Sequence, residues 1–235
     1  MLNSGTVPVA LSDLELDALT ELVNLGVGNA ALALREMMQE EVVLTVPSAS
    51  IMSREQAITN LQKTNQKRLV AVNQHFEGPI CGRALLIFPE AQSMELVRAI
   101  VGSDLSVADL MDLELEALAE TGNVLLNACL GTIANNLQRS LRLSLPEVVH
   151  GDGSDFFNLT SHPKADDTVL FIFIRFAVCQ RDISGYLAML LDLPSLIALK
   201  SLLAEFIERV KDSADPPLVT GDGGSVTTSA RPHGV

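Results

Sequence analysis

The chain carries an internal repeat, and this feature constrains its fold more than any other. Three residues recur at a constant interval of 99 positions: Glu21, Asn24 and Pro47 return as Glu120, Asn123 and Pro146. The segments VVLTVPS and LRLSLPE around the two prolines overlay directly, and CGRALLIFPE is answered further on by ISGYLAMLLDLP. Because this interval is too long for a solenoid unit, we expect two halves related by a pseudo-two-fold axis that share one core.

Both halves predict the same order of elements: a long helix, a strand, a connection, a strand pair, and a helix that begins at a proline. In the first half these are 12–38, 42–52, 68–76, 80–88 and 89–101. In the second half they are 110–141, 143–149, 168–179, 184–193 and 194–210, with a turn at 151–154. Ser12 followed by Glu15 is a capping-box pattern that places the start of the first helix.

These elements predict an α/β chain of the α+β type. Strand pairs joined by short connections favour a mixed or antiparallel sheet, whose faces the helices must cover. We expect one domain over residues 1–211, with halves at about 10–103 and 109–211. The tail at 212–235 is rich in Gly, Pro, Ser and Thr and predicts disorder.

Composition excludes several classes of function. A formal net charge of -13 repels phosphate backbones and anionic membranes, and no local basic patch offsets it. No apolar run is long enough to span a membrane, and no signal peptide is visible. Cys81, Cys129 and Cys179 lie far apart among apolar neighbours, which predicts buried free thiols in a reducing cytoplasm. The histidines and cysteines show no metal-ligand spacing, so we predict no metal site.

A polar stripe appears on both long helices. At about 100° per residue, Asp17, Glu21, Asn24 and Gly28 fall within roughly a sixth of the first helix's circumference. The second helix carries the corresponding stripe: Glu116, Glu120, Asn123 and Asn127. One such stripe would be an ordinary solvated face. Its duplication, with an asparagine that disfavours the middle of a helix in both copies, indicates a use beyond helix stability.

The chemistry of this pair of residue types suits phosphoryl transfer. A carboxamide cannot act as a general base at neutral pH, but it can hold a water molecule in line with a phosphorus atom. Because phosphoryl transfer needs mainly positioning and charge stabilisation, an orienting amide is a sufficient catalytic part. The neighbouring glutamate would contact a cation on a partner, since it repels phosphate.

The segments DALTELVNLGVGNAALAL and EALAETGNVLLNACLG resemble the two copies of the D/S-x3-E-x2-N signature of the CheC/CheX/FliY chemotaxis phosphatases. Asp17, Glu21 and Asn24 match in the first copy. Glu120 and Asn123 match in the second, where Glu116 replaces the usual Asp or Ser. The resemblance covers about residues 10–210 and is nearest to the CheC branch, because both copies are intact.

This resemblance implies hydrolysis of the phosphoaspartate on the response regulator CheY. Asn24 and Asn123 would each orient the attacking water, and Glu21 and Glu120 would each pair with the regulator's lysine. The regulator would supply Mg²⁺, so the resemblance implies no cofactor of the chain's own. The deamidase CheD is a second partner that the family implies. The alternative is a non-catalytic adaptor that uses the same helices to bind a receiver domain, CheD or the flagellar motor.

Overall fold

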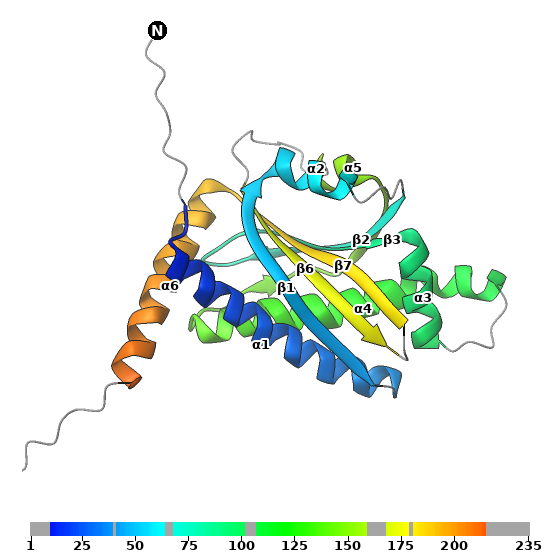
Figure 1. The fold of residues 1–235 in the computed structure, drawn as a ribbon, viewed down its shortest axis with the longest axis horizontal. Coiled ribbons are helices and arrows are strands. Elements are labelled where there is room, and N and C mark those ends of the chain that lie inside the picture. The colour runs from blue at the N-terminus through cyan, green and yellow to red at the C-terminus, as the bar shows by residue number, and fades with distance from the viewer. Residues whose placement is uncertain are drawn as a thin grey trace, which may run out of the picture.

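The computed structural model describes residues 10–39, 41–63, 68–101, 107–158, 168–178 and 181–214 (Figure 1). The first half contains α1 (Asp13–Met38), β1 (Val42–Ser53), α2 (Arg54–Lys63), β2 (Leu69–Glu77), β3 (Gly82–Pro89) and α3 (Glu90–Val101). The second contains α4 (Val107–Asn136), β4 (Arg142–Leu143), β5 (Glu147–Gly151), α5 (Gly153–Asn158), β6 (Thr168–Val178), β7 (Arg181–Leu191) and α6 (Leu193–Ala214). The order of elements is therefore the same in both halves, except that the short strands β4 and β5 stand where the first half has β1.

The first long helix begins where the capping box predicts. The Ser12 hydroxyl accepts a hydrogen bond from the Glu15 backbone N–H at 3.3 Å, and the Glu15 carboxylate accepts one from the Ser12 backbone N–H at 2.7 Å. Both bonds satisfy N–H groups that the first helical turn leaves unpaired. Lys200 of α6 also lies 3.6 Å from the Glu15 carboxylate, which ties the start of α1 to the last helix.

The sheet pairs the two halves by exchanging their first strands. Its order is β1-β6-β7-β3-β2, with both β4 and β5 on the free side of β2, and all these pairings are antiparallel. The hairpins β2–β3 and β6–β7 meet at the centre, where Leu85 pairs with Ala188. β1 of the first half pairs with β6, and β5 of the second half pairs with β2. This arrangement confirms the predicted pseudo-two-fold α/β fold.

The sheet has helices on both faces. One face packs against α1, α3, α4 and α6, and the opposite face packs against α2 and α5 (Figure 1). Strand alternation divides the residues between the two faces. In β3, Leu86 and Phe88 join the larger cluster beside α1 and α4, whereas Leu85 and Ile87 join the cluster beneath α2 and α5.

Several local predictions are wrong. Residues 54–63, expected as a connection, form α2, and the expected turn at 151–154 leads into α5, whose first backbone N–H groups bond to the Asp152 carboxylate. The strand expected at 143–149 is two short strands, β4 and β5, with Pro146 between them. A proline supplies no backbone donor to a ladder, which explains the interruption.

The ends of two helices also differ from the prediction. α4 stops at Asn136 instead of 141, and Gln138 beyond it has a φ of 54°, which a continuing helix cannot contain. α6 continues to Ala214, past the predicted domain end at 211. The rest of the predicted disordered tail lies outside the described residues.

The cysteines divide into two environments. Cys129 is buried in α4, and burial raises the pKa of its thiol to about 12. Cys81 is exposed at the turn before β3, so the prediction that it is buried is wrong. Cys179 lies outside the described residues. Within the described residues, no helix is both long and apolar enough to cross a membrane.

Candidate functional site

The two helices that carry the polar stripes lie side by side beneath the sheet (Figure 1). Gly26 of α1 lies against the backbone of α4, because a Cβ atom added there would lie 2.7 Å from the Cα atom of Cys129. Nearby, the Asn29 carboxamide donates a hydrogen bond to the Thr132 hydroxyl at 3.2 Å. The sequence therefore places a small residue where the two helix backbones meet, and this contact fixes the two stripes relative to each other.

The first stripe is fully open to solvent. Asp17, Glu21, Asn24 and Gly28 are all exposed, whereas Leu22 and Val23 on the other side of α1 are buried. Within the described part of the chain, the side chains of Glu21 and Asn24 have no hydrogen-bond or ion-pair partner. Both groups are thus available to a partner molecule.

The second stripe is held by its neighbours. Glu116, Glu120 and Asn127 are exposed and Asn123 is half-buried. The Oδ1 atom of Asn123 accepts a hydrogen bond from the Asn127 carboxamide at 2.8 Å. It accepts a second, longer one from the Gln74 carboxamide at 3.4 Å. The two copies of the motif are therefore inequivalent in their contacts, although they are similar in sequence.

Gln74 anchors this second copy to the sheet. It lies on β2 with only 1% of its surface exposed. Its Nε2 atom donates to the backbone oxygen of Ser144 at 2.7 Å and to Oδ1 of Asn127 at 3.3 Å. Among the described residues, its Oε1 atom is buried without a hydrogen-bond partner. Two amide hydrogens thus serve three acceptors.

Close packing of α4 on β2 brings these groups together. A Cβ atom added at Gly122 would lie 2.4 Å from Cγ1 of Val72, so α4 approaches β2 more closely than any larger residue would allow. Asn123 follows Gly122 directly, and Gln74 lies on the same face of β2 as Val72. Sequence reasoning missed Gln74. The available signal was a polar side chain at a helix-facing position of a strand rich in apolar residues.

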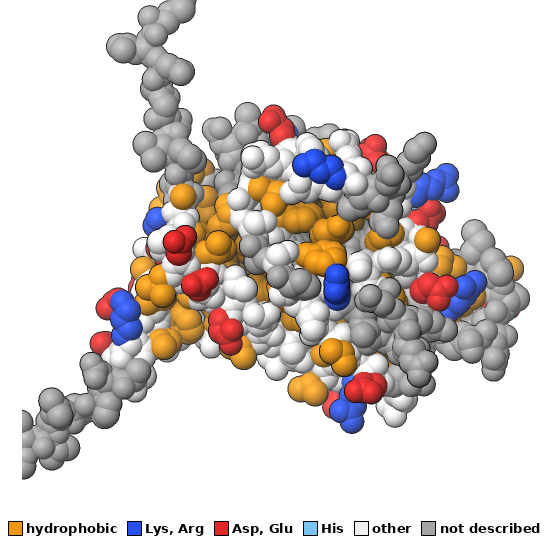
Figure 2. Space-filling model, in the orientation of Figure 1, with side chains coloured by type: hydrophobic (Ala, Val, Ile, Leu, Met, Phe, Trp, Pro, Cys, Tyr) orange, Lys and Arg blue, Asp and Glu red, His pale blue; other side chains and the backbone are white. Residues whose placement is uncertain are grey.

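Apolar side chains flank the first stripe. Leu14, Leu25 and Leu32 of α1 are 55%, 48% and 61% exposed. Helical geometry of about 100° per residue places them along one side of the stripe. Figure 2 shows acidic side chains in a row over α1 with apolar side chains close by. Exposed leucines beside a polar stripe are typical of a surface that binds another protein.

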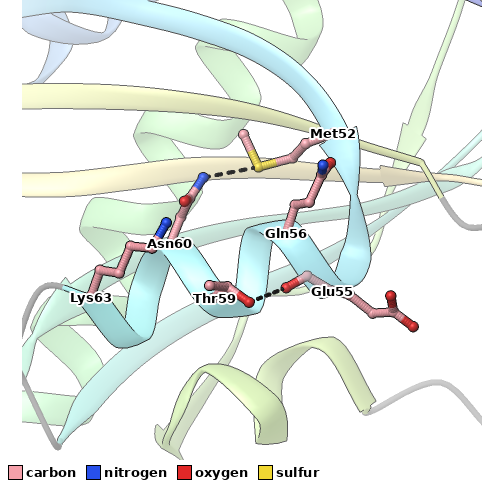
Figure 3. A pocket seen from close by; sticks show the side chains of 6 residues that line it. All are labelled: Met52, Glu55, Gln56, Thr59, Asn60 and Lys63. Carbon is pink, nitrogen blue, oxygen red and sulfur yellow. Dashed lines mark hydrogen bonds between the residues drawn. The ribbon is translucent and has the colours of Figure 1, made fainter.

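A surface hollow of about 420 Å³ lies elsewhere, against α2. Its lining residues are Met52, Glu55, Gln56, Thr59, Asn60 and Lys63 (Figure 3). Asn60 donates to the Met52 sulfur at 3.3 Å across it. None of the predicted site residues lines this hollow. Within the described ranges, no group of three or more His, Cys, Asp or Glu side chains could hold a metal ion.

No family model matches the chain. It is 26% identical over 137 residues to the CheY-P phosphatase CheC of Bacillus subtilis, a match covering 57% of this chain and 65% of CheC. It is 24% identical over 140 residues to the flagellar motor switch phosphatase FliY of the same organism, covering 59% of this chain and 36% of FliY. Each match therefore spans less than two thirds of the relative's own length, and the identity to CheC is modest.

Solved structures share the fold. The crystal structure of Thermotoga maritima FliY aligns with a TM-score of 0.68 at 16% identity, covering 84% of this chain and 100% of that one. A chain of the FliM–SpeE complex from H. pylori aligns with a TM-score of 0.61 at 10% identity, covering 84% of this chain and 98% of that one. Sequence relatives and fold agree with the duplicated motif and support a place for the chain in the CheC/CheX/FliY family.

Proposed function

We propose that the chain hydrolyses the phosphoaspartate of a CheY-type response regulator and that each stripe docks one regulator. The observation that carries the proposal is the Glu–Asn pair repeated on the surfaces of α1 and α4, in a chain that is similar to two curated proteins named as phosphatases. Both pairs lie on the helix surface, and Glu21, Asn24 and Glu120 are exposed. Such an open site suits a substrate that is itself a folded protein.

The proposed reaction transfers the phosphoryl group to water. The water oxygen attacks phosphorus with a lone pair, the bond between phosphorus and the aspartyl oxygen breaks, and inorganic phosphate and the regulator's free carboxylate result. The carboxamide oxygen of Asn24 accepts a hydrogen bond from the attacking water, which aims the lone pair at phosphorus. In this proposal Mg²⁺ is the regulator's own and neutralises charge on the phosphoryl oxygens.

The glutamates serve recognition in this proposal. Glu21 and Glu120 are exposed carboxylates one helical turn before Asn24 and Asn123. In the proposal, each would pair with a lysine ammonium on the docked regulator while the asparagine reaches the phosphoryl group. The exposed leucines beside the first stripe would contribute apolar contact to the same docking surface.

A non-catalytic adaptor is the second candidate. It is favoured by the fold similarity to FliM-containing structures, with a TM-score of 0.61 for a chain of the FliM–SpeE complex. Such an adaptor would bind a receiver domain, CheD or a motor component through the same helices without accelerating hydrolysis. Phosphate release separates the two functions.

A small amount of the chain is expected to release many equivalents of phosphate from a phosphorylated receiver domain. With the chain at about a tenth of the regulator concentration, we expect phosphate release at least ten times faster than the regulator's own hydrolysis. Release of ³²P from a ³²P-labelled regulator, in the presence of excess Mg²⁺, measures this rate. Binding of the phosphorylated regulator without any acceleration would contradict the phosphatase and support the adaptor.

Replacing both Glu21 and Glu120 with glutamine is expected to weaken regulator binding about five-fold at each site, the upper range for an exposed ion pair. The wild-type affinity should fall as NaCl is raised from 50 to 500 mM, because the Debye length shortens from about 14 to about 4 Å. The affinity of the variant should depend less on salt, because it lacks the ion pairs. Titration calorimetry with the activated regulator measures both effects. Glu36→Gln, an exposed carboxylate beyond the stripe on α1, is the matched control. Equal salt dependence in variant and wild type would contradict the ion pair.

A further inference from the structure

The two copies of the motif differ in whether the Oδ1 atom of the asparagine is free to accept a hydrogen bond from water. An attacking water directs a lone pair at phosphorus, so its hydrogens must be donated to acceptors, and the orienting group must offer an oxygen. The Oδ1 atom of Asn24 has no donor among the described residues. The Oδ1 atom of Asn123 already accepts bonds from Asn127 at 2.8 Å and Gln74 at 3.4 Å. A carbonyl oxygen has two lone pairs, so both are in use.

The residues that donate hydrogen bonds to Asn123 have no equivalent in the first half. At the repeat interval of 99 residues, Asn127 corresponds to Gly28, which has no side chain to donate. The strand register gives the counterpart of Gln74. At the interval of 99, Ser48 of β1 corresponds to Glu147 of β5. Ser48 pairs with Phe173 of β6 and Glu147 pairs with Asn73 of β2, so Phe173 and Asn73 are equivalent. The next residues along the two strands, Ile174 and Gln74, are therefore equivalent, and isoleucine donates no hydrogen bond.

From this difference we propose that Asn127 and Gln74 form a carboxamide clamp that slows catalysis through Asn123, leaving Asn24 as the main working group. The inference rests on the proposed function and assigns its two sites unequal roles. Asn127 makes the short bond to Asn123, and Gln74 positions Asn127 by donating to its Oδ1 at 3.3 Å. Asn127 and Gln74 are positioning residues in this proposal, since they act on the attacking water only through Asn123.

Breaking the hydrogen bonds of the clamp should require little free energy. Gln74 has two amide hydrogens for three acceptors and a buried Oε1 without a described donor, so the network is incompletely satisfied. Breaking the Asn127–Asn123 bond before catalysis should slow the second site about ten-fold, as expected for one to two neutral hydrogen bonds. The second site is thus less active than the first, and breaking the bonds to Asn123 would raise its activity.

Exchanging the clamp residues between the halves tests this inference through kcat. The loss from Asn24→Ala should exceed the loss from Asn123→Ala about five-fold or more. In the Asn24→Ala background, Asn127→Ala should raise kcat several-fold while the regulator's Kd stays constant, because it frees Oδ1 of Asn123. In the Asn123→Ala background, Gly28→Asn should lower kcat several-fold. An added Cβ at Gly28 meets nothing within 4 Å, so this change introduces a donor without a clash.

A matched control and an independent readout complete the experiment. Asn135→Ala changes another exposed asparagine of α4 and should leave the kcat of the Asn24→Ala variant as it was. Equal losses from Asn24→Ala and Asn123→Ala, with no gain from Asn127→Ala, would overturn the clamp while leaving the phosphatase intact. If the wild-type chain released no phosphate, the proposed function would fail instead. NMR of the side-chain amides then decides on the clamp alone: the Asn127 amide should exchange several-fold more slowly than that of Asn24, and equal exchange overturns it.

Discussion

Replacing Gly26 with alanine is expected to lower the free energy of unfolding by about 2 kcal/mol or more. The added Cβ would lie 2.7 Å from the Cα atom of Cys129 and 3.3 Å from the backbone oxygen of Ala128. Both neighbours are backbone atoms of α4, which cannot rotate away as a side chain could. The two helices would have to separate, and that loss exceeds the roughly 1 kcal/mol that alanine gains over glycine within a helix.

Gly28 supplies the matched control, two residues further along the same helix. It is exposed, and a Cβ added there meets nothing within 4 Å. Gly28→Ala should therefore raise the free energy of unfolding by about 0.5–1 kcal/mol through helix propensity alone. Urea denaturation followed by circular dichroism measures both variants. A Gly26→Ala protein as stable as Gly28→Ala would show that α1 and α4 do not pack at the distance described.

Local sequence patterns predicted the elements whose stability is itself local. The capping box at Ser12 and Glu15 and the apolar spacing along α1 depend on residues within one or two turns, so the helix was predicted almost to its ends. Both hairpins were predicted because their strands are rich in apolar residues and their connections are short. α2 was missed because it is polar, with only Ala57 and Leu61 buried. Its helical form depends on packing against the sheet.

Non-local pairing was less accessible to sequence reasoning. The repeat predicted a shared core, but no residue pattern specified that β1 would pair with β6 of the other half, or β5 with β2. The same limit applies to the site. The duplicated Glu–Asn pairs were visible as a helical stripe, whereas the contact of Gln74 with Asn123 links residues 49 positions apart. That contact depends on the close approach of α4 to β2 at Gly122, which only the folded arrangement reveals.

Removing both orienting carboxamides is expected to have the largest effect on activity. Asn24→Ala/Asn123→Ala should lower the rate of phosphate release on the order of a hundred-fold, as is common when a correctly placed polar group is lost. Each single change should give a smaller loss than the double variant, because the other copy of the motif remains, and Asn24→Ala should give the larger of the two single losses. Asn24 is exposed, and alanine is the better helix former, so its replacement should not destabilise the fold. Asn123→Ala removes the bonds from Asn127 and Gln74, so circular dichroism checks the folding of the double variant.

The unchanged glutamates allow a loss of catalytic rate to be separated from a loss of binding. Glu21 and Glu120 remain in the double variant, so the phosphorylated regulator should still bind with nearly the wild-type Kd. A large loss of kcat at constant Kd is the result expected for a group that acts on the attacking water. Loss of binding together with rate would instead assign the asparagines to docking.

The most direct test of the account is the rate of ³²P release from a phosphorylated receiver domain in the presence of wild-type chain or Asn24→Ala/Asn123→Ala. Regulator binding is measured in parallel for both proteins. The account predicts rapid multiple-turnover release with the wild type, and release with the bound double variant that is close to the regulator's own rate. Release by the double variant at the wild-type rate would contradict it.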